Sequence, residues 1–87
     1  MLITFDPAKD ARNREKHGIS LVEAEHLDWE TVKSFHDRRR AYGEDRQVGY
    51  GFLKGRLHSV VYTYRGMSLR IISLRKANMR ERKKYET

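Results

Sequence analysis

The pattern of apolar residues at the start of the chain predicts a strand followed by a helix. A short apolar run predicts the strand over residues 2–5. Asp6 then suits the N-cap of a helix, and Pro7 suits its first turn, because an N–H at that position would have no intrahelical partner. We expect this helix to run to about His17 and to end at Gly18.

A second helical pattern begins at Ser20. Glu23 follows three residues later, and the two residues together form a capping-box pattern at the start of a helix. Apolar residues then recur at helical spacing. The expected buried stripe consists of Leu21, Ala24 and Leu27, closed by Trp29. The sequence therefore predicts two helices near its amino terminus.

Strand signals dominate from Thr31 onward. Turn signals at Lys54-Gly55 and Arg65-Gly66 separate apolar segments of strand length. We expect strands over 31–35, 46–53, 56–64 and 68–75. Because consecutive segments are joined by tight turns, they should form an antiparallel meander.

The segment over 76–87 is helical in propensity and strongly basic, with few apolar anchors. Its cations are Lys76, Arg80, Arg82, Lys83 and Lys84. Since no linker or repeat interrupts the chain, we expect one domain over 1–87. The predicted fold class is α+β, with two N-terminal helices and a basic C-terminal helix around an antiparallel sheet.

The charge of the chain narrows its partners. Nineteen Lys and Arg against 12 Asp and Glu give a net charge of +7, which favours a polyanion or an acidic protein as partner. The amino terminus shows neither a signal peptide nor a membrane span, so a cytoplasmic protein without membrane association is expected. The chain has no cysteine, which excludes disulfides and thiolate chemistry.

The strand expected over 68–75 carries the most unusual residues. Arg70, Ser73 and Arg75 interrupt an apolar strand, which suggests that it lines a cleft. Strict alternation places Arg70 on one face of this strand and Ser73 and Arg75 on the other. Both arginines can reach one phosphate only with a bulge, a strong twist, or one arginine at the strand end.

Four blocks of the sequence resemble the BrnT family of toxins. They are Asp6-Pro7-x-Lys9 with Asn13, Lys16-His17-Gly18-Ile19-Ser20, Tyr42-Gly43-Glu44-Asp45-Arg46, and Arg70-Ile71-Ile72-Ser73-x-Arg75-Lys76-Ala77 followed by Glu81 and Tyr85. The likeness covers nearly the whole chain. One departure is Leu74, where a small residue is expected, and it concerns packing rather than chemistry.

The resemblance implies a RelE-like fold and a ribonuclease activity that arrests translation and growth. It also implies neutralisation by a BrnA-like antitoxin with a ribbon-helix-helix DNA-binding domain. The expected partners are thus an RNA substrate and this antitoxin, in a hetero-oligomer.

Cleavage of RNA without a metal requires a base for the 2′-OH, cations for the phosphorane and an acid for the 5′ oxygen. Arginines match phosphate oxygens bidentately and stay charged at any working pH. The candidate catalytic residues are His17, Glu44, Arg46, Arg70 and Arg75, and the candidate substrate-binding residues are Lys16, Ser73 and Lys76.

Each candidate also has a purely structural interpretation. His17 can serve as a helix C-terminal cation, Glu44 can pair with Arg46, and Ser73 can bond locally within its strand. The run Arg38-Arg39-Arg40 can be a solvated loop rather than a phosphate-binding one. No cofactor is expected, and no metal site either, because His26, His36 and His58 lack metal-ligand spacing.

Two functions of different class follow. The first is a metal-independent endoribonuclease toxin, supported by the arginines, the titratable residues and the family resemblance. The second is a non-catalytic basic module that binds nucleic acid, supported by the charge and the basic C-terminal segment alone.

Overall fold

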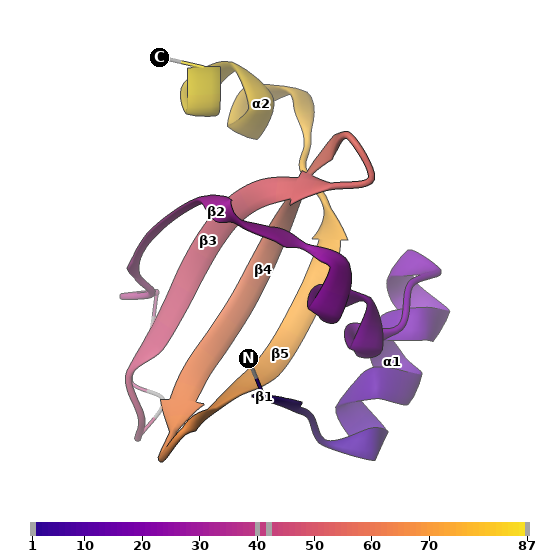
Figure 1. Cartoon of the computed structure of the whole chain (residues 1–87), viewed down its shortest axis with the longest axis vertical. Coiled ribbons are helices and arrows are strands. Elements are labelled where there is room, and N and C mark those ends of the chain that lie inside the picture. The colour runs from indigo at the N-terminus through magenta and orange to yellow at the C-terminus, as the bar shows by residue number, and fades with distance from the viewer. Residues whose placement is uncertain (1, 40, 42, 87) are drawn as a thin grey trace.

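The computed structural model describes residues 2–39, 41 and 43–86, in an α+β arrangement that confirms the expected fold class (Figure 1). Its elements are β1 (Leu2–Thr4), α1 (Pro7–His17), η1 (Leu21–His26), β2 (Asp28–His36), β3 (Arg46–Leu53), β4 (Arg56–Arg65), β5 (Ser68–Lys76) and α2 (Met79–Glu86). Two residues of the predicted motifs, Arg40 and Tyr42, lie outside the described residues.

The strands form one five-stranded sheet in the order β1-β5-β4-β3-β2. Strands β2 to β5 form the predicted antiparallel meander. The expectation of a wholly antiparallel sheet is wrong, because β1 pairs with β5 in parallel, with Ile3 opposite Leu69. The connection from β1 passes through α1 and η1 before it enters the meander at the far edge of the sheet.

The prediction of a second N-terminal α-helix is also wrong. Residues 21–26 form a six-residue 3₁₀ helix, η1, in which each N–H bonds to the carbonyl three residues before it. Ser20 caps η1 as expected, since its hydroxyl accepts a hydrogen bond from the Val22 N–H. The segment cannot lengthen into an α-helix because Asp28, two residues after its end, already belongs to β2.

One face of the sheet, which we call the core face, packs against η1. Leu21 and Ala24 of η1 are fully buried there. Because a 3₁₀ helix has three residues per turn, these two side chains lie on the same side of η1. The apolar cluster comprises Leu21, Ala24, Leu27, Leu53, Val60, Tyr62, Leu69, Ile71 and Leu74. The opposite face, which we call the open face, carries the alternate residues of the same strands, among them Ser59, Val61 and Thr63 of β4.

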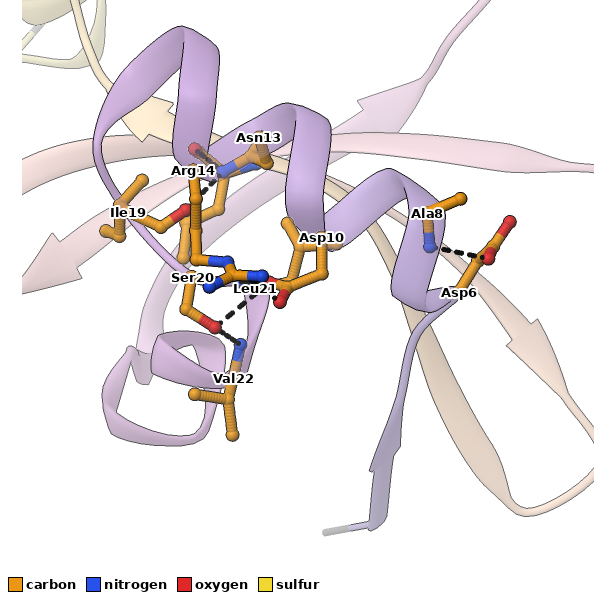
Figure 2. Close-up of polar contacts among 10 residues, drawn as sticks. Asp6, Ala8, Asp10, Asn13, Arg14, Ile19, Ser20, Leu21 and Val22 are labelled. Atoms are coloured by element: carbon orange, nitrogen blue, oxygen red, sulfur yellow. Dashed lines mark hydrogen bonds and ion pairs between the residues drawn. The ribbon is translucent and has the colours of Figure 1, made fainter.

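Buried polar residues anchor α1, which has few apolar ones (Figure 2). The Asp10 carboxylate accepts hydrogen bonds from the Ser20 hydroxyl and the Leu21 N–H, at 2.9 and 2.7 Å. These bonds, with the Leu21 N–H contributing most, lower the pKa of Asp10. Asn13 is 6 % exposed, and its side-chain amide donates to the carbonyls of Ile19 and Leu74 and accepts from the Leu74 N–H.

The contacts of Asn13 complete one edge of the sheet. β1 covers β5 only as far as Arg70, so the backbone of Leu74 lies beyond its reach. The Asn13 amide bonds both polar groups of that backbone unit, as a neighbouring strand would. The position of α1 is therefore fixed against the part of β5 that carries the site.

A bulge in β5 places Arg70 and Arg75 on the same face. Val61 of β4 pairs with Ser73 and Tyr62 pairs with Ile71, so Ile72 is an extra residue in β5. Before the bulge Arg70 lies opposite Thr63, and after it Arg75 lies opposite Ser59. Thr63 and Ser59 both belong to the open face, and cross-strand partners share a face. The bulge that the arginines were expected to need is thus present.

Helix α2 begins three residues later than expected, because Lys76 still belongs to β5 and Ala77 is buried, with its N–H bonded to the Leu57 carbonyl. No residue of α2 is buried among those described. The helix lies beyond one end of the sheet (Figure 1) and is attached there through Tyr85. The Tyr85 hydroxyl bonds to the Thr31 carbonyl, and its ring packs edge-on against Phe52 at 5.5 Å.

Within the described ranges, no helix has the length and apolar character that a membrane crossing requires.

Candidate active site

The open face carries a cavity of about 1040 Å³, which we call the central cavity. Its floor includes Val48, Tyr50, Ser59 and Val61 from β3 and β4. The end of α1, β5 and the start of the 37–45 loop form its walls. Its cations are Lys16, Arg38, Arg39, Arg46 and Arg75, and His17 lies with them. The cavity is therefore concave and strongly basic, as a site for a phosphate diester must be.

Arg75 is held in the central cavity by Glu81 of α2. The guanidinium donates to the two carboxylate oxygens of Glu81 through Nη1 and Nη2, at 2.8 and 2.9 Å. Tyr50 donates its hydroxyl proton to the same carboxylate at 2.9 Å. Three elements, β3, β5 and α2, thus meet at one carboxylate.

The hydrogen bonds from Arg75 lower the pKa of Glu81 from 4.5 to about 2 and raise the pKa of Arg75. Both groups therefore stay charged at any working pH, and Glu81 cannot exchange protons in catalysis. Burial, and then the bond to Glu81, raise the pKa of Tyr50, so its proton is also retained. This group of side chains serves to hold the guanidinium in position.

The bond to Glu81 occupies only one edge of the guanidinium. Glu81 uses Nη1 and Nη2, and Nη1 also donates to the Lys76 carbonyl at 3.2 Å. Among the residues that the structure describes, none bonds the Nε–H of Arg75. The edge formed by Nε and Nη2 can therefore donate two parallel hydrogen bonds to a phosphate while Glu81 fixes the other edge.

His17 reaches the central cavity from the last turn of α1. Gly18 ends the helix there with φ of 71°, a left-handed conformation that glycine adopts without steric cost, and its N–H bonds to the Arg14 carbonyl. Partial burial, followed by the charges of Lys16 and Arg75, lowers the pKa of His17 below 6.5. The imidazole is therefore mostly neutral at pH 7, as a general base must be.

Arg46 lines the central cavity and a smaller neighbouring cavity of about 670 Å³. Glu44 lines only the smaller one, 4.0 Å from Arg46 and 3.8 Å from Arg65. These separations are long for ion pairs, so each arginine interacts only weakly with the Glu44 carboxylate. Glu44 thus lies near the site, with Arg46 between it and the centre of the cavity.

Part of the predicted arginine run lines the central cavity. Arg39 binds the buried Asp37 carboxylate through Nε and Nη2, at 2.7 and 2.6 Å. Asp37 in turn bonds its N–H to the Arg46 carbonyl. The loop is therefore folded back onto β3 at its start, which brings Arg38 and Arg39 to the rim of the cavity.

The structure brings together some of the predicted site residues and separates others. Lys16, His17, Arg46, Ser73 and Arg75 line the central cavity. Arg70 is on the same face but does not line it, and Lys76 points toward the core face, opposite His58. Within the described residues, no three His, Cys, Asp or Glu side chains are grouped so that they could hold a metal ion.

Three residues of the central cavity had no functional role predicted from the sequence. Glu81 appears in the family-like blocks, but its contact with Arg75 depends on how α2 turns back. Tyr50 reads as an ordinary strand residue. Phe35 lies at the sheet edge, 55 % exposed, with its ring 6.0 Å from that of Tyr50. An exposed aromatic beside a basic cavity offers a stacking surface for a base.

A family model described as "Ribonuclease toxin, BrnT, of type II toxin-antitoxin system" matches residues 5–81. This span begins at Phe5, directly after β1, ends at Glu81 of α2, and contains every described residue of the central cavity. No curated protein matches the chain.

Proposed function

Because the chain belongs to the BrnT family of ribonuclease toxins of type II toxin-antitoxin systems, we propose that it cleaves RNA in the central cavity without a metal ion. One observation supports the assignment to this cavity: Arg75, held by Glu81, keeps one guanidinium edge that Glu81 does not use, and Arg46 and the His17 imidazole line the same cavity. On the same grounds we assign the chain a RelE-like fold and a place in the cytoplasm, where translated RNA is found.

The proposed reaction is an internal transesterification. The 2′ oxygen attacks the adjacent phosphorus, forming a 2′-O–P bond, and the P–O5′ bond breaks. The products are a 2′,3′-cyclic phosphate and a 5′-hydroxyl end. The transition state carries extra negative charge on the phosphate oxygens, which Arg75 and Arg46 stabilise more strongly than they stabilise the substrate.

His17 is the base that removes the 2′-OH proton in this proposal, because its neutral form prevails at pH 7. Lys16 is the neighbouring cation that can donate a proton to the leaving 5′ oxygen. Glu44 is the alternative titratable group, although it lies beyond Arg46. Ser73, on the cavity wall, can bond a phosphate oxygen or a ribose hydroxyl.

Cleavage should continue in the presence of EDTA, because arginines supply the positive charge that a metal ion supplies in other nucleases. The measurement uses purified protein, end-labelled RNA and mapping of the product ends. We expect 2′,3′-cyclic phosphate and 5′-hydroxyl ends, and no cut at a position carrying a 2′-deoxy sugar. Loss of cleavage on chelation, with recovery on addition of Mg²⁺ or Zn²⁺, would contradict the metal-free mechanism. The absence of any cleavage by folded protein would favour the alternative, a non-catalytic binding module.

Replacing His17 by Gln should remove the acid limb of the pH–rate profile. A base works in its deprotonated form, so kcat/KM of the natural chain should rise with pH through the pKa of His17, below 6.5, and then level off. Gln has a similar size but no titratable nitrogen, so its profile should be flatter across that range. A profile that keeps the same acid limb would leave His17 as a helix-terminal residue only.

The proposed protein partner is a BrnA-like ribbon-helix-helix antitoxin. The exposed side of α2 carries Arg80, Arg82, Lys83 and Lys84, and no residue of α2 is buried among those described. An acidic partner would find there a surface of opposite charge beside the central cavity. Binding at this surface would favour a hetero-oligomer and would stabilise a small domain by mass action.

A further inference from the structure

A third cavity, of about 530 Å³, lies on the core face beside the turn between β3 and β4, and we call it the hairpin cavity. It is walled by the end of α1, the start of η1 and the ends of β3, β4 and β5. Its ionisable residues are His17, Glu23, Lys54, Arg56, His58 and Lys76. The mechanism above uses only His17 of this group.

His58 is the unusual member of this wall. It is 5 % exposed, and its Nδ1 lies 2.7 Å from the Arg56 carbonyl oxygen. A carbonyl only accepts hydrogen bonds, so Nδ1 carries the ring proton and Nε2 presents a lone pair. Among the described residues, none bonds this Nε2. Burial lowers the pKa of His58, which keeps the ring in this neutral form.

Cations surround the opening of the hairpin cavity. Arg56 and Lys76 are exposed on neighbouring strands, and Lys54 is exposed at the turn. The carboxylate among them, Glu23, lies 3.4 Å from Lys54 and offsets part of that one charge. Arg56 and Lys76 remain available to an anion. The cavity therefore combines a positive rim with one inner hydrogen-bond acceptor.

The hairpin cavity and the central cavity adjoin at the end of α1. His17 lines both. Arg75 and Lys76 are consecutive in β5 and point to opposite faces, Arg75 to the central cavity and Lys76 to the hairpin cavity. A strand of RNA with its phosphate at Arg75 can thus continue past His17 to Lys76 without leaving a basic surface.

We propose that the hairpin cavity is a second RNA subsite, which binds a nucleotide adjacent to the scissile phosphate. Its phosphate contacts Arg56 and Lys76, and an O–H or N–H of its ribose or base donates to Nε2 of His58. This assignment rests on the proposed ribonuclease function and adds to it a binding position outside the central cavity.

The chemistry of the cavity fits a nucleotide better than a carboxylate side chain alone. An ionised carboxylate matches the cations but has no proton to donate to Nε2. A nucleotide supplies both a negative phosphate and donor groups, including the 2′-OH. The acceptor at the base of the cavity is thus satisfied by a nucleotide and left unsatisfied by a carboxylate side chain.

The test compares RNA substrates lengthened one nucleotide at a time on each side of the mapped cleavage site. In the natural chain, KM should fall by roughly tenfold at the length that first reaches the hairpin cavity, the effect expected of a charge-assisted hydrogen bond. Arg56→Ala should abolish this fall in KM with RNA length, which we call the length step, and leave the KM of the shortest cleavable RNA unchanged. His58→Gln, which can place an amide oxygen near the site of Nε2, should retain more of the step than His58→Leu does.

The matched control is Arg12→Ala, which removes one exposed cation from α1 and should keep the step. The same length series in RNA with a 2′-deoxy sugar at the cleavage site, followed by fluorescence anisotropy, measures binding alone. If the natural chain cuts no RNA, no deoxy sugar is needed, and anisotropy with an unmodified RNA series lengthened one nucleotide at a time still measures binding, so a failure of the subsite differs from a failure of the proposed function.

Two outcomes would overturn the subsite. In the first, Arg56→Ala weakens short and long RNA equally, as loss of a general surface charge would. In the second, no length step is seen in any variant, while Arg56→Ala weakens binding of an antitoxin protein. That outcome would make the hairpin cavity a protein-binding surface.

Discussion

Replacing Arg75 by Ala should reduce the rate of RNA cleavage by about 10³-fold while the domain stays folded. Arg75 is held in the central cavity through two bonds to Glu81, which leave its Nε–H available to a phosphate. Removal of one preorganised donor to a transition-state oxyanion costs on the order of 10²–10³ in rate. RNA affinity should change little, since one phosphate contact among several is lost. Single-turnover kinetics, with the protein in excess over the RNA and its concentration varied, would separate the two effects.

Arg75→Ala also leaves the Glu81 carboxylate in the cavity without its cation. The double variant Arg75→Ala, Glu81→Gln removes this complication and should be as slow as the single variant. Arg75→Lys keeps a charge but loses the bidentate geometry, so it should recover only part of the rate. A folded Arg75→Ala protein that cuts at the natural rate would show that the central cavity is not the catalytic site. Arg70→Ala should cost less, because Arg70 does not line the cavity.

Replacing Asn13 by Leu should lower the free energy of unfolding by about 3 kcal/mol, because three hydrogen bonds in a buried setting are lost and the backbone of Leu74 is left unsatisfied. For a domain of this size, such a change corresponds to a fall in Tm of roughly 10–20 °C. Urea unfolding should show a lower midpoint with an unchanged m value.

The adjacent Arg12→Leu is the control for this prediction. Residue 12 is exposed on the same helix, so a leucine there tests the effect of a side chain of the same size without the loss of hydrogen bonds. It should be nearly neutral. If Asn13→Leu were as stable as the natural chain, the Asn13 amide would not be the group that completes the edge of β5.

The elements predicted correctly are those whose ends are set by nearby residues. Asp6, Pro7 and Gly18 determine the bounds of α1, and the glycine turns after Lys54 and Arg65 determine those of β3, β4 and β5 to within a residue. Two larger errors, a second α-helix and a wholly antiparallel sheet, depend on distant contacts. Leu21 and Ala24 suit either helix type, and only packing on the sheet selects the short 3₁₀ form.

The same distinction applies to the site. The sequence singled out Arg70 and Arg75, because charge in an apolar strand is visible locally, but only Arg75 lines the central cavity. The bulge at Ile72 decides the faces of Arg70 and Arg75, and it arises from the register of β5 against β4. The backbone of β5 beyond the bulge is fixed by Asn13, about sixty residues away in the chain. Glu81 could be found only once α2 was seen to return to β5.

The shared guanidinium of Arg75 has a thermodynamic consequence for the whole domain. One edge holds α2 through Glu81, and the other is available to a phosphate. A phosphate bound to Arg75 and the Glu81 carboxylate are both negative and lie on the same guanidinium, so they repel each other. A phosphate in the cavity would therefore weaken the docking of α2. Coupling between two binding events is reciprocal. A partner that draws α2 away from the sheet would therefore alter the affinity of Arg75 for a phosphate by the same factor.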